Sequence, residues 1–155
     1  MFQGHAICTL DAKSRLVLPS KFRKYIKTES NNKLILMKGM DQCIMAFPSD
    51  EWEKKVKEAA RKFNIFNPVQ RNFLRQLLND VYECEIDAHN RILLPSELTS
   101  YAEIKKEVIV LGMIYVLEIW DPVAKKKYDE LHRDTYEDAA QKVSEMFFSF
   151  GDNEQ

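Results

Sequence analysis

The sequence has 155 residues, of which 45% are hydrophobic and 30% are charged, and its formal net charge is −1. These are ordinary values for one globular domain, or for two very small halves that share a core. No stretch approaches the roughly 18 uninterrupted apolar residues of a membrane span, and the N-terminus lacks the pattern of a secretory signal. We therefore expect a soluble, cytoplasmic protein with no membrane partner.

The three cysteines, Cys8, Cys43 and Cys84, are an odd number, lie far apart and form no CxxC pair. This pattern argues against a disulfide framework and a zinc site, so we interpret them as small core residues. The sequence also lacks the glycine-rich phosphate loops, zinc-protease motifs and nucleophile elbows of common enzymes. We predict no enzymatic activity, no metal, no cofactor and no small-molecule substrate.

The charges are divided unequally along the chain. Residues 1–79 carry 15 basic and 7 acidic residues, a net charge of +8, whereas residues 80–155 carry 8 basic and 17 acidic residues, a net charge of −9. Such a separation favours a polyanion as the partner of one face. The alternative explanation is that the two halves neutralise each other, within one chain or between subunits.

A ten-residue segment occurs twice in the chain. Residues 11–20 read DAKSRLVLPS and residues 87–96 read DAHNRILLPS, so that six of the ten positions are identical. Each copy is followed by an apolar strand that ends in a glycine, Gly39 or Gly112, and then by a strand that ends in an aromatic residue and a proline. The chain is therefore predicted to be a tandem duplication, with one repeat over residues 1–79 and a second over residues 80–155.

Each repeat is predicted to contain a strand, a turn, a strand, a short helix, a hairpin and a longer helix. In the first repeat, Ile7–Leu10 and Leu16–Leu18 are predicted strands on either side of a polar turn. Pro19 ends the second strand, and the hydroxyl of Ser20 is expected to cap a short helix over Lys21–Ile26.

A hairpin then leads to the longer helices. Asp50, with Glu53 three positions later, resembles a capping box and predicts a helix that Asn67-Pro68 ends. A further amphipathic helix leads into a strand over Val81–Ile86, the first strand of the second repeat.

In the second repeat, Ser96 is expected to cap the short helix. Asp121 caps and Pro122 opens one long amphipathic C-terminal helix, which is expected to fray at residues 151–155.

A single repeat with such short strands would be marginally stable alone, so we expect the two repeats to pair about an approximate two-fold axis. Pairing would place the turn Asp11–Arg15 beside the turn Asp87–Arg91. Asp11 and Asp87 are predicted to position these turns by accepting backbone N–H groups and orienting the arginine four residues later.

Arg15 and Arg91 are the leading candidates for contact with DNA, because a guanidinium binds a phosphate or a guanine edge through two hydrogen bonds. The full set of predicted DNA-binding residues is Lys13, Arg15, Lys21, Arg23 and Arg91. The second repeat has His89, Glu97 and Thr99 where the first has Lys13, Lys21 and Arg23. The first repeat is therefore predicted to be the better binder of a polyanion.

Several motifs occur together and in order: Met1-Phe2-x-Gly4-His5, two Asp-x-x-x-Arg turns that each lead to Leu-Pro, Lys38-Gly39-Met40-Asp41, and Glu118-Ile119-Trp120-Asp121. These motifs resemble the MraZ family over residues 1–135. The resemblance implies a mixed α+β fold with a mainly β core and peripheral helices, a pseudo-two-fold swapped-hairpin barrel of the AbrB/SpoVT type. Both halves of this barrel would come from one chain.

The resemblance also implies a function. It indicates a sequence-specific, double-stranded DNA-binding transcriptional regulator that binds repeated promoter elements as a ring-shaped homo-oligomer. Such a regulator would repress its own gene and the division and cell-wall gene cluster, and would associate with the nucleoid. The alternatives are a ring-forming scaffold, or an antitoxin-like swapped-hairpin module, with incidental DNA binding.

One departure from the family pattern concerns the turns. Family members often have glycine directly before the turn arginine, whereas this chain has Ser14 and Asn90. Asparagine tolerates a left-handed backbone conformation and serine does so less readily, so the sequence leaves the geometry of the turns open.

Overall fold

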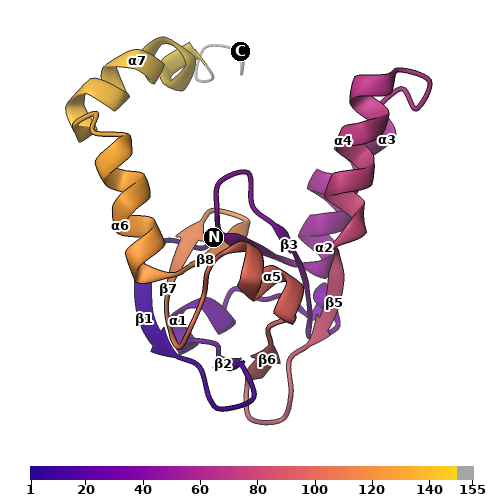
Figure 1. Cartoon of the computed structure of the whole chain (residues 1–155), viewed down its shortest axis with the longest axis vertical. Helices are drawn as coiled ribbons and strands as arrows, with labels where there is room; N and C mark the ends of the chain where they lie inside the picture. Colours follow the sequence, from indigo (N-terminus) through magenta and orange to yellow (C-terminus); the bar gives the residue numbers. More distant parts are fainter. Residues whose placement is uncertain (150–155) are drawn as a thin grey trace. The chain divides into compact units, whose positions relative to one another are not determined.

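The computed structural model describes residues 1–149, and the chain divides into two compact units, Met1–Ala124 and Lys125–Gln155 (Figure 1). The predicted frayed end at residues 151–155 lies outside the described residues. No helix within residues 1–149 is both long enough and apolar enough to cross a lipid bilayer.

The first unit is built on antiparallel strands. They are β1 (His5–Thr9), β2 (Arg15–Val17), β3 (Lys33–Lys38), β4 (Ile44–Pro48), β5 (Tyr82–Glu85), β6 (Arg91–Leu93), β7 (Glu107–Met113) and β8 (Val116–Trp120). Six of them form one sheet in the order β1-β7-β8-β4-β3-β5, and β2 pairs with β6 in a separate ribbon. The predicted strands of both repeats are thus present, and β7 continues through Gly112, where we expected a strand to end.

The two repeats exchange their first strands. β1 of the first repeat pairs with β7 of the second, and β5 of the second repeat pairs with β3 of the first. β4 and β8 join the two halves of the sheet at its centre. Neither repeat therefore contains a complete sheet, in agreement with the pairing expected from their small size.

No closed barrel forms among the described residues, in contrast to the barrel that we predicted. The larger sheet ends in β1 on one side and in β5 on the other. β1 and β2 follow each other in the chain but form no ladder together, because each is hydrogen bonded to a strand of the other repeat. The result is an open sheet and a separate ribbon.

The helices lie between and after the strands. They are α1 (Ser20–Arg23), the 3-10 turn η1 (Thr28–Ser30), α2 (Ser49–Trp52), the π-helical segment η2 (Glu53–Lys57), α3 (Glu58–Arg61), α4 (Pro68–Asn79), α5 (Ser96–Tyr101), α6 (Pro122–Leu131) and α7 (Tyr136–Ser149). α2, η2 and α3 are continuous and correspond to the predicted helix after Asp50. Trp52, Val56 and Leu77 from these helices pack against a small cluster of buried side chains in the sheet.

Three predicted helix caps are wrong. Ser20, Ser96 and Asp50 make no capping hydrogen bond to the first turn of their helices. In each case a proline takes the N-cap position, so the helix begins earlier than expected, by one residue at Ser20 and Ser96 and by two residues at Asp50. The predicted capping residue then lies inside the first turn, where its side chain does not reach the free N–H groups.

The cap at Asp121 is confirmed. Its Oδ2 accepts the backbone N–H groups of Val123 at 3.1 Å and of Ala124 at 2.9 Å, and Pro122 is the first residue of α6. Asn67 not only separates two helices, as predicted, but also caps α4 through its side-chain oxygen.

The predicted single C-terminal helix is wrong. α6 ends at Leu131, and α7 begins at Tyr136. The hydroxyl of Thr135 accepts the backbone N–H of Asp138 at 3.1 Å, so that Thr135 starts a new helix. The apolar spacing that we interpreted as one helix therefore continues across a break.

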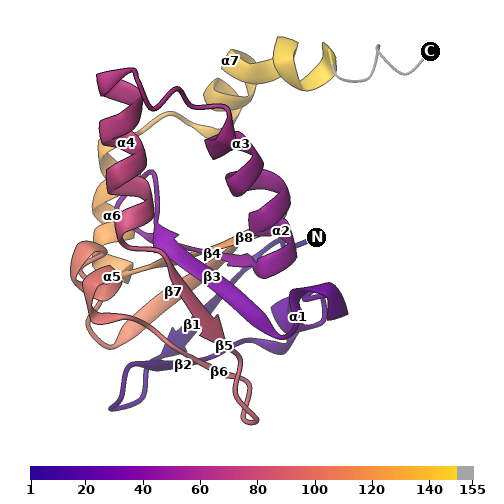
Figure 2. The ribbon, with the colours of Figure 1, turned by 90° about the vertical axis from the view of Figure 1, so that its right-hand side faces the viewer.

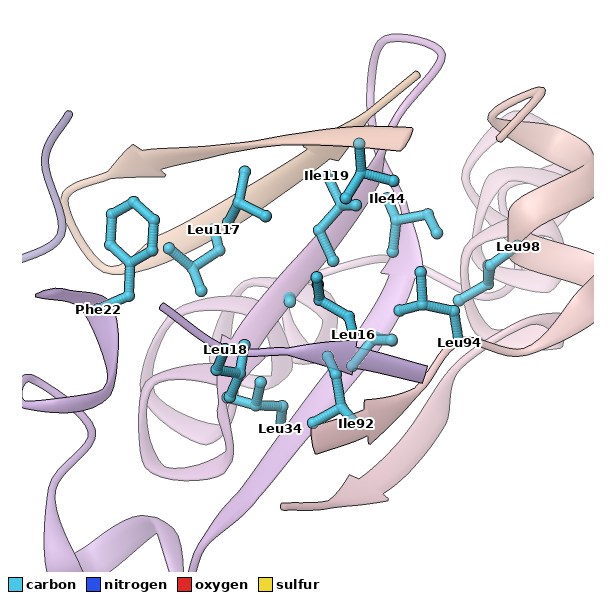
Figure 3. Packing of buried hydrophobic residues seen from close by; sticks show 14 of the residues in the cluster. Leu16, Leu18, Phe22, Leu34, Ile44, Ile92, Leu94, Leu98, Leu117 and Ile119 are labelled. Carbon is cyan, nitrogen blue, oxygen red and sulfur yellow. The ribbon is translucent and has the colours of Figure 1, made fainter. Parts of the chain in front are cut away.

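The core lies between the six-stranded sheet and the ribbon (Figure 3). Leu16 and Ile92 are the middle residues of β2 and β6, face each other across the ribbon and are almost completely buried. They pack in one cluster with sheet residues such as Leu34, Leu117 and Ile119. The ribbon is thus anchored through one face, and its other face is directed away from the core.

Candidate nucleic-acid interface

The first turn is organised by the carboxylate of Asp11. Its Oδ1 accepts the backbone N–H of Lys13 at 2.9 Å and of Arg15 at 3.0 Å, and its Oδ2 accepts the Nε hydrogen of Arg15 at 2.7 Å. The hydrogen bonds from Arg15 and Lys13 hold the pKa of Asp11 below its ordinary value, although partial burial acts in the opposite direction. Asp11 therefore accepts hydrogen bonds from both the turn backbone and the guanidinium, which are the contacts that a positioning role requires.

The second turn has the same arrangement. Asp87 accepts the backbone N–H groups of His89 and Arg91, both at 2.9 Å, and the Nε hydrogen of Arg91 at 2.8 Å. The backbone N–H of Arg91 is the largest cause that lowers the pKa of Asp87. The duplicated sequence thus produces two turns with the same hydrogen bonds.

The residues before the two arginines resolve the question that the sequence left open. Ser14 and Asn90 both adopt the left-handed conformation, with φ of 59° and 61°. The Ser14 carbonyl accepts the N–H of Leu94 at 3.0 Å, and the Asn90 carbonyl accepts that of Leu18 at 2.9 Å. Each turn is therefore tied to the other repeat, with the backbone that a glycine would adopt at these positions.

The strand register places both arginines on one face of the ribbon. Arg15 lies opposite Leu93, and Val17 lies opposite Arg91. Because side chains alternate along a strand, all four point away from the buried middle pair. Arg91 lies on the neighbouring strand, two residues along from the position opposite Arg15. The Cα atoms of Arg15 and Arg91 are therefore about 8 Å apart.

Neither arginine is buried in the core, and the two turns do not lie at opposite poles. The side chains of Arg15 and Arg91 are 30% and 25% exposed. Both turns project from the same end of the first unit, at the bottom of the two views (Figures 1 and 2). The two turns thus lie beside each other, as expected from the pairing of the repeats.

Each aspartate leaves part of its arginine available. Asp11 and Asp87 bind Nε of Arg15 and Arg91, and the two terminal nitrogens of each guanidinium have no hydrogen-bond partner among residues 1–149. These terminal nitrogens can donate two hydrogen bonds to one phosphate or to one guanine edge. The aspartate fixes the direction of the group without occupying this edge.

The other predicted contacts differ in their positions. Lys13 is exposed in the first turn. Lys21, on α1, donates from Nζ to the carbonyl of His5, at the start of β1, and lies over the Phe22 ring. Arg23 is half-buried, and its Nε finds no partner in the part of the chain that the structure describes. The structure thus brings Lys13, Arg15 and Arg91 together at the ribbon and its turns, whereas Lys21 and Arg23 lie on α1.

The exchange of strands changes how the charge of the repeats is distributed in space. α1, the basic helix of the first repeat, follows Leu18, which is hydrogen bonded to Asn90 in the second turn. α5, which carries Glu97, similarly follows Leu94, which is bonded to Ser14 in the first turn. The surroundings of each turn thus come from both repeats. The net charge of one repeat therefore does not decide which turn is the better binder.

Two residues of this face were not among our candidates. Val17 and Leu93 are 53% and 57% exposed although both are large and apolar. The signal was present in the alternation of the strands, because each lies between two buried leucine or isoleucine residues. The burial classes of residues 15–24 are repeated position by position in residues 91–100.

The cysteines are free thiols, as predicted. Cys43 is buried, and Cys8 and Cys84 are half-buried against the core. Burial, with a smaller effect of Glu83, raises the pKa of Cys84 to about 11, so this thiol is protonated at neutral pH. Among the described residues, no group of His, Cys, Asp and Glu side chains is arranged to hold a metal ion.

The fold and the site together define a class: an α+β protein of two strand-exchanged repeats, which presents two aspartate-held arginines on one ribbon. Comparison with known proteins gives the family. The chain matches the family described as "MraZ protein, putative antitoxin-like" over residues 1–76 and again over residues 77–149. The chain belongs to the MraZ family.

Curated relatives carry the name transcriptional regulator MraZ. The chain is 34% identical to the protein of Desulfitobacterium hafniense over 143 residues, 92% of this chain and 96% of the relative. It is 34% identical to that of Syntrophobacter fumaroxidans over 150 residues, 97% and 96% of the two chains, and 36% identical to that of Carboxydothermus hydrogenoformans over 143 residues, 92% and 96%. Family membership confirms the predictions of a transcriptional regulator and of a protein that is not an enzyme.

Proposed function

We propose that this regulator binds double-stranded DNA in a sequence-specific way through the outer face of the β2–β6 ribbon and its two turns. The observation that carries the proposal is the pair of guanidinium groups on one face, each held at Nε by an aspartate. A two-stranded ribbon fits the major groove of B-DNA, which is about 12 Å wide.

The chemistry of binding follows from this arrangement. The terminal nitrogens of Arg15 and Arg91 donate two hydrogen bonds each to a guanine edge or to a phosphate. Asp11 and Asp87 hold the guanidinium groups in place before DNA arrives, so less side-chain freedom is lost on binding. Lys13 adds a flexible positive charge near the backbone of the duplex.

Lys21 and Arg23 stay predicted contacts of the DNA backbone. Both lie on α1, which begins two residues after Leu18. The backbone N–H of Leu18 donates to the carbonyl of Asn90 in the second turn. To reach DNA, Lys21 would have to exchange its hydrogen bond to His5 for one to a phosphate. The boundary between repeats at residues 79 and 80 likewise stays a proposal.

Removal of one arginine tests the proposal. We expect Arg15→Ala and Arg91→Ala each to weaken binding to a promoter duplex by about 1–3 kcal/mol, the usual value of a bidentate base contact. Arg61→Ala is the matched control, because it removes the same charge from an exposed residue of α3. Unchanged affinity of a folded Arg15→Ala protein, measured by fluorescence anisotropy, would refute the assignment.

The regulatory role is proposed from the family resemblance. We infer that the protein represses its own gene and the division and cell-wall gene cluster, and binds repeated promoter elements as a homo-oligomer at the nucleoid in the cytoplasm. Several subunits on consecutive elements would gain affinity through effective concentration. The test compares binding to the upstream region of its own gene with binding to a shuffled duplex at physiological salt.

A scaffold or an antitoxin-like module is the alternative. Its support is the antitoxin-like description of the matched family and the amphipathic α7. Such a protein would bind both duplexes equally, so the same experiment separates the two functions.

A further inference from the structure

We propose that Val17 and Leu93 form an apolar centre on the ribbon that recognises the 5-methyl groups of thymine in the major groove. This inference rests on the proposed function, since it names the bases that the ribbon reads. It adds two residues of a different chemistry to the arginine contacts.

The register gives the geometry. Across the ribbon, Leu93 faces Arg15 and Val17 faces Arg91, so each arginine has one apolar neighbour at about 5 Å between Cα atoms. The two pairs are related by exchange of the strands. The face therefore presents two copies of one unit, an arginine beside an apolar side chain, in opposite directions.

The exposure of Val17 and Leu93 indicates a binding partner more strongly than the exposure of a single apolar residue does. Single exposed apolar residues are common on protein surfaces. Here both repeats place one at the same position, and both lie between two arginines on the face that points away from the core. The same face carries the terminal nitrogens of both arginines, unpaired within the described part of the chain, which a duplex can supply with acceptors and a second copy of this donor-bearing face cannot. A second copy of the chain is thus a poor occupant.

Thymine has the matching chemistry. In the major groove, guanine presents two acceptors to an arginine, and thymine presents a methyl group that makes apolar contacts. The Cα spacing within one unit is close to that of one or two base-pair steps, which rise about 3.4 Å each. We therefore expect a site in which guanine and thymine lie one or two steps apart, in two inverted copies.

Replacement of thymine by uracil tests the inference, because it removes only the methyl group. The probe is the duplex that the protein itself enriches most from a random 20-base-pair pool, remade with one deoxyuridine at a time. We expect the parent to bind about fourfold more weakly for each critical methyl removed, the effect of burying one CH₂ group. In Val17→Ser and Leu93→Ser, we expect the loss to disappear at one position each.

Matched variants complete the experiment. Val123→Ser makes the same change at a residue of similar exposure, 56%, on α6, and should keep the full sensitivity to uracil. Val17→Gln also removes the branched apolar group, and it replaces Val17→Ser if circular dichroism shows that the serine variant is unfolded.

The outcomes distinguish failure of DNA binding by the ribbon from failure of thymine recognition by Val17 and Leu93. If the pool yields no enriched duplex, or if Arg15→Ala binds as the parent does, the proposed function fails. If the arginine variants lose binding but uracil has the same effect in the parent and in Val17→Ser, only the thymine inference is wrong. A loss of self-association in Val17→Ser, seen by sedimentation, would assign this face to a second copy instead and also overturn the inference.

Discussion

Gly112 lies where the N-terminal segment pairs with β7, and its replacement by alanine should detach that segment. A Cβ atom at this position would lie 2.5 Å from the backbone nitrogen of Gln3 and 2.7 Å from the carbonyl carbon of Phe2. Both neighbours are backbone atoms, so they cannot give way by rotation of a side chain. The segment must move as a whole.

The cost can be worked out from the contacts that would be lost. Phe2 is buried, and burial of a phenylalanine contributes about 1.5–3 kcal/mol. Phe2 and Ile114 exchange two backbone hydrogen bonds, and Gly112 donates a third to Gly4, each contributing about 1 kcal/mol. Partial relaxation of the segment recovers some of this, so we expect Gly112→Ala to lower the free energy of unfolding by about 3–5 kcal/mol.

Urea denaturation followed by circular dichroism measures the effect. Phe2→Ala should cost about 3–5 kcal/mol alone. The double variant should cost much less than the two single losses together, because alanine at position 112 has already displaced Phe2. A loss below about 0.5 kcal/mol for Gly112→Ala, or full additivity in the double variant, would refute the reasoning.

Two further predictions concern the turns. Ser14→Gly should stabilise the protein by up to about 1 kcal/mol, because serine at φ 59° carries a backbone strain that glycine avoids, and Ser14→Val should destabilise it. Thermal unfolding of the parent and both variants measures the difference. Equal stability of the three proteins would contradict the strain. Because the pKa values of Asp11 and Asp87 are lowered in the folded state, their contribution is present above the pKa of the unfolded chain and is lost as pH falls through the folded value. The stability difference between the parent and Asp11→Asn should therefore shrink below about pH 4; a difference that stays constant down to pH 2 would show that the carboxylate does not act through its charge.

The parts of the fold that were predicted depend on local patterns. Both turns, their flanking strands and α4 follow from short-range signals, and the repetition of residues 11–20 at 87–96 made each signal visible twice. The hydrogen bonds of Asp11 and Asp87 were also predictable, because an aspartate at the start of a turn commonly binds the N–H groups of that turn.

The parts that were missed depend on competition or on distant pairing. Serine is a preferred N-cap residue, which is why Ser20 was predicted to cap α1. The preceding Pro19 takes the N-cap position instead, so the predicted cap lies one residue too late. The apolar spacing after Pro122 does not reveal that Thr135 starts a second helix. The alternation along β2 places Val17 and the two leucines beside it on opposite faces, but it does not show which face meets the core, because the ribbon partner lies in the other repeat.

The exchange of strands has a consequence for synthesis of the protein. His5 pairs with Leu111, so β1 stays without a partner until more than two thirds of the chain has left the ribosome, several seconds or longer at roughly 5–20 residues per second. Contacts this distant in sequence also slow folding. A prematurely terminated product that lacks β6 cannot assemble the paired-arginine ribbon, so such fragments cannot compete with the finished regulator for its target.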